Sequence, residues 1–270
     1  MSWNGRVNGK VALVIGAGGK DNIGQVIARA LAAEGAQVVV AGRTLAPLEA
    51  FAEEIGGWAA VCDITSQADA QSLADGIRAR TGGVDIVVNA TGHGLRGPFE
   101  SLTEAQLREI VDLQFIGPFL FFQALLPVVR DGGSLIQISS ATATIMLDDH
   151  AAYMGTKAGF DHVMRCIALV AGPRGVRVNS ISPGLTDSPM TAAAKTIPGV
   201  FETYRSKYPL GRLGTADDIA AAVLWLAGDD CFMTGQNLQV NGGLTLRGNP
   251  SRAEIDAAVI ALTGAPRPAP

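Results

Sequence analysis

Residues 11–36 read VALVIGAGGKDNIGQVIARALAAEGA and decide how the chain begins to fold. The apolar run at 11–15, followed by glycine, predicts a buried parallel strand, and after the turn apolar residues recur at helical spacing. Glycines let a backbone pass close to a bound group, and a helix start directs free N–H groups at a phosphate. The glycines in question are Gly16, Gly18, Gly19 and Gly24. Strand, turn and helix in this order predict a dinucleotide-binding βαβ unit.

Strands and helices alternate along the rest of the chain as far as Val240, which is typical of an α/β fold. Further strands are expected at residues 37–41, 58–63, 84–92, 134–139 and 176–182, and LQVNGG closes the sheet. We therefore predict a single-domain, Rossmann-type, doubly wound and mostly parallel sheet of seven strands flanked by helices. Its core spans about residues 9–243 of the single domain 1–270.

Four further segments are expected. The sequence TEAQ from Thr103 predicts a capping box that opens a helical region, and Pro118 predicts a break or kink near Gly117. Residues 187–210 contain aromatic residues and prolines, and are expected to form an irregular, mobile lid. Thr215 is expected to cap the next helix. Residues 246–270 form a tail with one possible helix at 251–262, which stays local or packs on a neighbour.

Composition limits the partners. The formal net charge of −4, without a long basic cluster, gives no electrostatic case for nucleic acid. The polar first ten residues do not resemble a signal sequence, and no apolar run approaches the length of a membrane span. Three cysteines without a close pair argue against a disulfide framework or a zinc cluster. We expect a cytoplasmic protein without a metal site.

A second stretch, SSATATIMLDDHAAYMGTK at residues 139–157, contains a serine, a tyrosine and a lysine that can act together. Tyr153 and Lys157 are four residues apart in a predicted helix, so their side chains leave the same face. An adjacent cation lowers the pKa of a phenol, which makes Tyr153 an expected proton donor or acceptor. Ser140 follows a predicted strand whose carboxyl end opens onto the ligand crevice of such sheets. Alone, these residues are also typical of a half-buried tyrosine, a solvated lysine and a turn serine.

The end of the second strand bears on the cofactor. Gly42 occupies the position where an acidic residue would bond a ribose hydroxyl, and Arg43 follows it. Because arginine accommodates a 2′-phosphate, NADP(H) is favoured over NAD(H). The alternative is that Arg43 is an ordinary exposed loop arginine. Asp63, at the end of the third strand, is expected to accept from the adenine amine or to cap a helix.

In combination these motifs resemble the short-chain dehydrogenase/reductase family over roughly residues 9–243. The glycine loop, Asp63, NATG at Asn89, Ser140, Tyr153 with Lys157, PG at Pro183 and TGQNLQVNGG occur in the family's order. The resemblance implies hydride transfer between a nicotinamide cofactor and a carbonyl or secondary alcohol. Tyr153 would be the general acid or base, Lys157 would lower its pKa and bond the nicotinamide ribose, and Ser140 would hold the substrate oxygen. It places at the cofactor Gly16, Gly18, Asn22, Ile23, Gly24, Arg43, Thr44, Asp63, Ile64, Asn89, Ala90, Gly92, Tyr153, Lys157, Pro183, Gly184, Thr186 and Ser188.

Two departures from the family pattern stand out. The glycine loop is longer than usual, with Asn22 in place of the middle glycine, a spacing similar to that of enoyl reductases of fatty-acid synthesis. Those enzymes have a wider tyrosine–lysine spacing. Lys20 in this loop reaches a phosphate or is solvated. Gln114 replaces the asparagine that holds a relay water in most members, and we expect it to keep or replace that water among the catalytic residues.

We predict an oxidoreductase acting on an apolar ketone or its alcohol, since no basic cluster marks a site for a carboxylate or phosphate. The alternatives are a 3-oxoacyl-thioester reductase and, in a different class, a catalytically silent nucleotide-binding regulator. Apolar helices at residues 114–129 and 153–171 suggest a homo-oligomer, either a tetramer or a dimer. His93 and His150 border the substrate or are ordinary loop residues, and His162 is expected on a helix surface.

Overall fold

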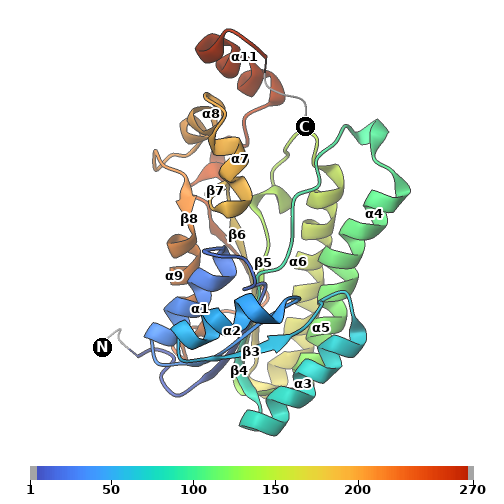
Figure 1. Ribbon diagram of the computed structural model, residues 1–270, viewed down its shortest axis with the longest axis vertical. Helices are drawn as coiled ribbons and strands as arrows, with labels where there is room; N and C mark the ends of the chain where they lie inside the picture. The colour runs from blue at the N-terminus through green and yellow to red at the C-terminus, as the bar shows by residue number, and fades with distance from the viewer. Residues whose placement is uncertain (1–4, 267–270) are drawn as a thin grey trace.

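The computed structural model describes residues 5–266 as an open sheet with helices on both faces (Figure 1). The strands are β1 (Val11–Ile15), β2 (Gln37–Gly42), β3 (Trp58–Val61), β4 (Val84–Asn89), β5 (Val129–Ile138), β6 (Arg177–Pro183) and β9 (Asn237–Val240). Their order is β3-β2-β1-β4-β5-β6-β9, and every neighbouring pair is parallel. The predicted seven-stranded Rossmann-type sheet is confirmed. The order reverses between β1 and β4, so the crevice for ligands lies at the carboxyl ends of these strands.

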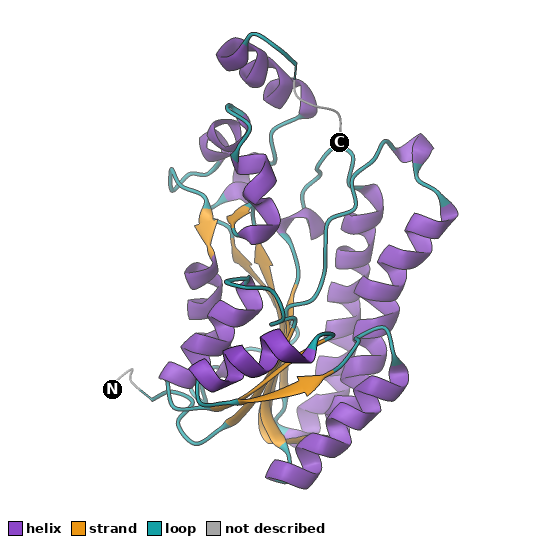
Figure 2. Ribbon diagram, in the orientation of Figure 1, coloured by secondary structure: helices purple, strands orange, loops and turns teal. Residues whose placement is uncertain are grey.

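Helices bury both faces of the sheet (Figure 2). One face carries α3 (Gln67–Thr81), α5 (Gly117–Leu125) and α6 (Ala151–Ala171), and the other carries α1 (Ile23–Ala33), α2 (Leu45–Glu54) and α9 (Ala216–Ala227). Successive residues of a strand point to opposite faces, so Leu13 packs in the first layer and Val14 in the second. Because both layers are apolar, the strands read as continuous apolar runs.

A third apolar cluster lies beyond the carboxyl edge of the sheet, where α8 and α11 stand at the top of Figure 1. Its elements are the small sheet of β7 (Thr186–Asp187) and β8 (Gly214–Thr215) and the helices α7 (Ala192–Lys195), α8 (Val200–Lys207), α10 (Leu244–Arg247) and α11 (Arg252–Thr263). The predicted tail helix is therefore confirmed as α11, with Ser251 as its N-cap. The prediction that residues 187–210 lack regular structure is wrong, because they contain the helices α7 and α8. Tyr204 of α8 and Ile255 of α11 belong to this one cluster, and the long-range packing of α8 on α11 stabilises a helix without a strong local signal.

The break or kink predicted near Gly117 is an interruption of the regular α-helix and not the end of a helix. The capping box at Thr103 opens α4 (Glu104–Val111) as expected, but the chain then continues through a π-helical turn, Asp112–Ile116, into α5. In this wider turn the N–H of Gly117 donates to Asp112 O, and Pro118 lies in the first turn of α5, where its missing N–H is not needed. Within residues 5–266 the run Glu104–Val128 is the one helix long and apolar enough to cross a membrane. Its Phe121 and Phe122 lie in the core, as expected of a core helix.

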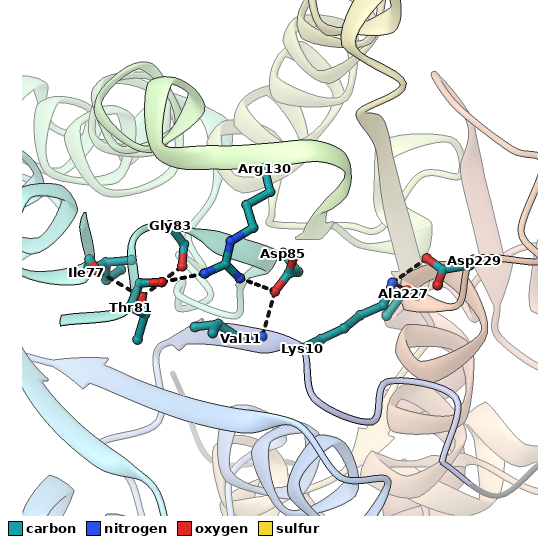
Figure 3. Close-up of polar contacts among 9 residues, drawn as sticks. All are labelled: Lys10, Val11, Ile77, Thr81, Gly83, Asp85, Arg130, Ala227 and Asp229. Atoms are coloured by element: carbon teal, nitrogen blue, oxygen red, sulfur yellow. Dashed lines mark hydrogen bonds and ion pairs between the residues drawn. The ribbon is translucent and has the colours of Figure 1, made fainter. Parts of the chain in front are cut away.

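Polar contacts fasten the opposite, amino edge of the sheet (Figure 3). Asp85 of β4 accepts from the backbone N–H of Val11 at 2.7 Å and pairs with Arg130 of β5 at 2.6 Å. Arg130 also donates to the carbonyl of Thr81 at the end of α3, and Lys10 pairs with Asp229 beyond α9. The charged side chains at this edge are therefore engaged in holding strands and helices together.

Candidate active site

Two adjoining cavities open at the carboxyl edge of the sheet. The first, which we name the tyrosine pocket, has a volume of about 660 Å³ and is lined by Ser140, Tyr153 and Lys157. The second, the glycine-loop cleft, has a volume of about 860 Å³ and extends from the loop after β1 past the ends of β2 and β3. Both are lined by Ile23, Ala90, Thr91, Gly92, His93, Ser188 and Met190. A molecule that fills both cavities would reach from the glycine loop to Tyr153.

The structure brings most of the predicted cofactor residues to these cavities. The glycine-loop cleft is lined by Gly16, Gly18, Asn22, Ile23, Gly24, Arg43, Thr44, Asp63, Ile64, Ala90, Gly92 and Ser188, and the tyrosine pocket by Pro183, Gly184 and Thr186. Asn89 lines neither cavity and is fully buried. Its Oδ1 accepts from the N–H of Thr91 at 3.0 Å, and its Nδ2 donates to Gln137 at 2.9 Å. Asn89 therefore holds the turn that carries Ala90 and Gly92.

The glycine loop is closed by backbone contacts that leave no room for side chains. Gly16 has φ +97°, and a Cβ there would lie 2.7 Å from the carbonyl carbon of Ala90. A Cβ on Gly24 would lie 2.5 Å from the carbonyl oxygen of Gly16. Asn22 caps α1 by accepting from Gln25 N at 2.9 Å and donates to Gly16 O at 2.8 Å, so it ties the longer loop to the helix. Lys20 is exposed and does not line the cleft.

The far end of the cleft contains the residues predicted to meet the adenosine. Arg43 is exposed and forms no ion pair with any residue between 5 and 266. Asp63 Oδ1 accepts from both the backbone N–H and the hydroxyl of Thr65, at 2.9 and 2.7 Å. Ser66, not Asp63, is the N-cap of α3. The helix-cap alternative for Asp63 is thereby wrong, and its second oxygen is available to a ligand.

The side chains of Ser140, Tyr153 and Lys157 converge in the tyrosine pocket. Ser140 hydrogen-bonds to the Tyr153 phenol, and its Oγ also lies 2.9 Å from the hydroxyl of Thr142. Lys157 Nζ donates to the Ile138 carbonyl at 3.0 Å and lies 5.8 Å from the centre of the Tyr153 ring. The alternative of a solvated lysine is therefore wrong, whereas Ser140 does lie at a turn, where its Oγ also accepts from Thr142 N at 3.2 Å.

Burial sets the protonation of this group. Burial raises the pKa of Tyr153, and the hydrogen bond with Ser140 opposes that rise. Burial also lowers the pKa of Lys157 to about 8, while the nearby carboxylate of Asp161 acts in the other direction. The expected lowering of the Tyr153 pKa is wrong in this structure, because desolvation of the buried phenol is the largest effect on its pKa and raises it. Tyr153 is therefore a protonated phenol at neutral pH.

Gln114 lies behind the tyrosine pocket. Its Nε2 donates to the His93 carbonyl at 2.7 Å, and its Oε1 is buried without a partner among the described residues. A Cβ on Gly92 would be 3.4 Å from Lys157 Nζ and 3.6 Å from Gln114 Oε1, so both groups face the same piece of backbone. A buried acceptor without a partner beside an ammonium is where a bridging water is expected.

Sequence reasoning missed Asp161, one helical turn after Lys157. Its carboxylate is buried and accepts hydrogen bonds from Ser139, at 2.9 Å, and from Asn237 of β9. Burial raises the pKa of Asp161, and those hydrogen bonds together with the charge of Lys157 oppose the rise. An acidic residue four positions after the predicted active-site lysine is the signal that would have found it.

The tail supplies the far wall of the tyrosine pocket, with residues that the sequence alone did not identify. Ile255 of α11 lines the pocket. The N–H of Arg252 donates to Asp148 Oδ2 at 2.7 Å, and its guanidinium pairs with Asp149 Oδ2 at 2.9 Å. The tail thus packs on the loop that precedes Tyr153. The residues that contact the tail lie about a hundred positions earlier in the chain, so the sequence near α11 indicates its position only through the capping box at Ser251.

The three histidines fall in different places. His162 is exposed on α6, as predicted, His93 lines both cavities, and His150 lines the tyrosine pocket. Across residues 5–266 there is no group of three or more His, Cys, Asp or Glu side chains that could hold a metal ion.

Comparison with known proteins agrees with this geometry. A family model described as Enoyl-(Acyl carrier protein) reductase matches residues 16–245. A D-threitol dehydrogenase of Mycolicibacterium smegmatis is 34% identical over 255 residues, covering 92% of this chain and 97% of that protein. The structure of a short-chain type dehydrogenase/reductase from Mycobacterium ulcerans superimposes with a TM-score of 0.86 at 30% identity, covering 90% and 92% of the two chains. That of a gluconate 5-dehydrogenase from Burkholderia cenocepacia in complex with NADP and tartrate gives 0.84 at 26% identity, covering 90% and 98%.

Proposed function

The chain belongs to the short-chain dehydrogenase/reductase family and is an oxidoreductase that acts on alcohols, and we propose that Tyr153 is its general acid and base. One observation carries this proposal: Ser140, Tyr153 and Lys157 line a single cavity that continues into the glycine-loop cleft. Membership of an enzyme family, together with this convergence, argues against the silent nucleotide-binding regulator.

The chain's own groups move and hold the proton. In reduction Tyr153 donates its proton to the carbonyl oxygen, while the Ser140 hydroxyl donates a hydrogen bond to the same oxygen. In oxidation the proton passes from the alcohol to Tyr153, and the ammonium of Lys157 stabilises the phenolate that this requires. Bound NADP(H) would supply or accept the hydride. The raised pKa of Tyr153 suits the donor role at neutral pH.

The glycine-loop cleft fits a dinucleotide. Ile23 and Gly24, in the first turn of α1, line it where a pyrophosphate would meet free N–H groups, and a Cβ on Gly18 would meet open space. Within NAD(P)-dependent chemistry, NADP(H) is our proposal, because Arg43 lines the cleft and pairs with no carboxylate in the described part of the chain. A relative with NADP bound supports the same choice.

Replacement of Arg43 by alanine is expected to raise the KM for NADP⁺ by about tenfold, since hydrogen bonds to a charged group are the stronger ones. The KM for NAD⁺, which lacks the 2′-phosphate, should change little. Initial rates of alcohol oxidation with each cofactor measure both values, and Arg78→Ala, on the exposed face of α3, is the control. An equal rise for the two cofactors would contradict the proposal.

Gln114 is proposed to hold a water that relays protons to Lys157. Truncation in Gln114→Ala is expected to lower kcat by roughly tenfold and to change the pH profile, because proton exchange between the buried Lys157 side chain and solvent loses its path. Gln114→Asn, which keeps the amide, should retain part of the rate. Full turnover of Gln114→Ala with an unchanged pH profile would remove this role.

The substrate is proposed to have an apolar skeleton, because much of the wall of the tyrosine pocket is aliphatic. The side chains concerned are Leu147, Leu185, Ala193, Ile197 and Ile255. D-Threitol, the alcohol in the name of one relative, has hydroxyl groups on neighbouring carbons, and it supports an alcohol as the reacting group.

A coupled assay tests the proposed function. Purified protein is mixed with NADPH and a panel of ketones, and absorbance at the reduced nicotinamide band is followed. We expect turnover of free cyclic or aryl ketones. A strong preference for acyl thioesters would favour a 3-oxoacyl-thioester reductase instead, and tight cofactor binding without any substrate in a broad screen would count against the proposal.

We propose the oligomeric state, the cellular location and the domain organisation of this enzyme. Exposed apolar side chains on the two helical regions predicted as an interface, Ile116 and Phe119 on one and Leu169 and Val170 on the other, support a homo-oligomer, either a tetramer or a dimer. Three free thiols support a cytoplasmic location. Within one catalytic domain, residues 187–210 are proposed as the lid and 246–270 as the tail, the last four lying outside the described residues.

A further inference from the structure

His150 lines the tyrosine pocket but has no part in the mechanism above. It is the residue before the first turn of α6 and makes no side-chain hydrogen bond that caps the helix. Its ring centre lies 6.2 Å from that of Tyr153, with the two planes at 76°. An imidazole edge is therefore placed beside the proposed proton donor, within the cavity that would take the substrate.

A hydrogen bond fixes the tautomer of this imidazole. His150 Nδ1 lies 2.8 Å from the carbonyl oxygen of Asp148. Because a carbonyl oxygen only accepts, Nδ1 carries the hydrogen, and in the neutral ring Nε2 carries the lone pair. Nε2 has no hydrogen-bond partner within residues 5–266. The free nitrogen is thus an acceptor.

The surroundings keep the ring neutral. Burial and the positive charge of Arg96, in the loop after β4, lower the pKa of His150, against the opposing effects of the Asp148 carbonyl and the Asp149 carboxylate. Asp149 is itself paired with Arg252 of α11, so its negative charge is partly neutralised. The amino end of α6 also disfavours an imidazolium. On α6 itself, the Lys157 ammonium lies 5.8 Å from the centre of the Tyr153 ring and adds no negative charge.

We infer that His150 Nε2 accepts a hydrogen bond from a hydroxyl group on the carbon next to the reacting one. The substrate class is then a vicinal diol in oxidation and an α-hydroxyketone in reduction. The inference rests on the proposed function, since it takes Tyr153 and Ser140 to hold the reacting oxygen. Because the two rings are neighbours that line one pocket, a hydroxyl on the carbon next to the one held at Tyr153 would lie on the side of His150. A partly buried acceptor of this kind discriminates between substrates, because a substrate without the second hydroxyl leaves it unpaired.

The test compares trans-cyclohexane-1,2-diol with cyclohexanol, which share a ring and differ in one hydroxyl. His150→Ala is expected to lower kcat/KM for the diol by about tenfold and to leave cyclohexanol nearly unchanged. His150→Gln keeps an acceptor and should restore part of the diol activity. His162→Ala, on the exposed face of the same helix, is the matched control. In the wild type, the KM for the diol should rise as pH falls through the lowered pKa of His150, since a protonated Nε2 no longer accepts.

Other results overturn the inference. Equal losses on the two alcohols would make His150 a positioning residue for Tyr153, and no loss on either would leave it without a role in specificity. A wild type that oxidises cyclohexanol but not the diol would overturn the inference and leave the proposed function standing. A wild type inert towards both alcohols and both corresponding ketones would overturn the two together.

Discussion

The Tyr153→Phe variant is expected to lose about 10³-fold in kcat, in both alcohol oxidation and ketone reduction, and to bind NADPH as the wild type does. Phenylalanine keeps the ring that packs beside His150 and above Lys157, so the pocket retains its shape. Only the proton and its oxygen are removed. Ser140 still holds the substrate oxygen, which explains why some activity should remain. Steady-state rates followed by nicotinamide absorbance measure the loss, and NADPH fluorescence measures binding.

Tyr204→Phe is the matched control for this experiment. Tyr204 lines the same pocket from α8, and its replacement by phenylalanine also removes one phenolic hydroxyl. We expect it to affect KM more than kcat, because it lies in the wall and not beside Lys157. Comparable turnover in Tyr153→Phe and the wild type would end the case for Tyr153 as the proton donor, whatever the cofactor affinity.

The fold was predictable where its signals are local. β1 occupies the residues predicted for it, and the helix after the glycine loop begins at Ile23, because buried strands and amphipathic helices carry their periodicity in a few consecutive residues. The helices α7 and α8 were not predictable in this way. They are short and lie among prolines, and α8 is stabilised by packing against a tail helix some fifty residues further along the chain.

In the candidate site, too, features with a local sequence signal were predictable, and features that depend on long-range packing were not. The pairing of Tyr153 with Lys157 follows from helical spacing alone, and the structure places both in one pocket. The direction of the Tyr153 pKa does not follow from spacing, since it depends on how much protein covers the phenol. The tautomer of His150 and the pairing of Arg252 with Asp149 likewise depend on where loops meet in three dimensions. Sequence motifs therefore identify the residues that would react. The protonation states of these residues and the specificity for a substrate depend on the three-dimensional structure.

The second large effect is expected at Gly24, in the first turn of α1. A Cβ there would lie 2.5 Å from the carbonyl oxygen of Gly16 and 2.8 Å from its carbonyl carbon. Both are backbone atoms and cannot rotate away, so in Gly24→Ala either the helix or the glycine loop must shift. We expect the free energy of unfolding to fall by about 1–3 kcal/mol, as for other overpacked sites. The Kd for NADPH should rise by at least about tenfold, because the loop that lines the cleft moves.

Gly76→Ala separates this clash from the general effect of alanine in a helix. Gly76 lies inside α3, and a Cβ there would meet nothing within 4 Å. Alanine at that position should raise the free energy of unfolding by about 1 kcal/mol and leave the Kd for NADPH unchanged. Urea unfolding and NADPH fluorescence titration of the two variants give both quantities. If Gly24→Ala were as stable as Gly76→Ala and bound NADPH as tightly as the wild type, the close approach of α1 to the glycine loop would have no bearing on cofactor binding.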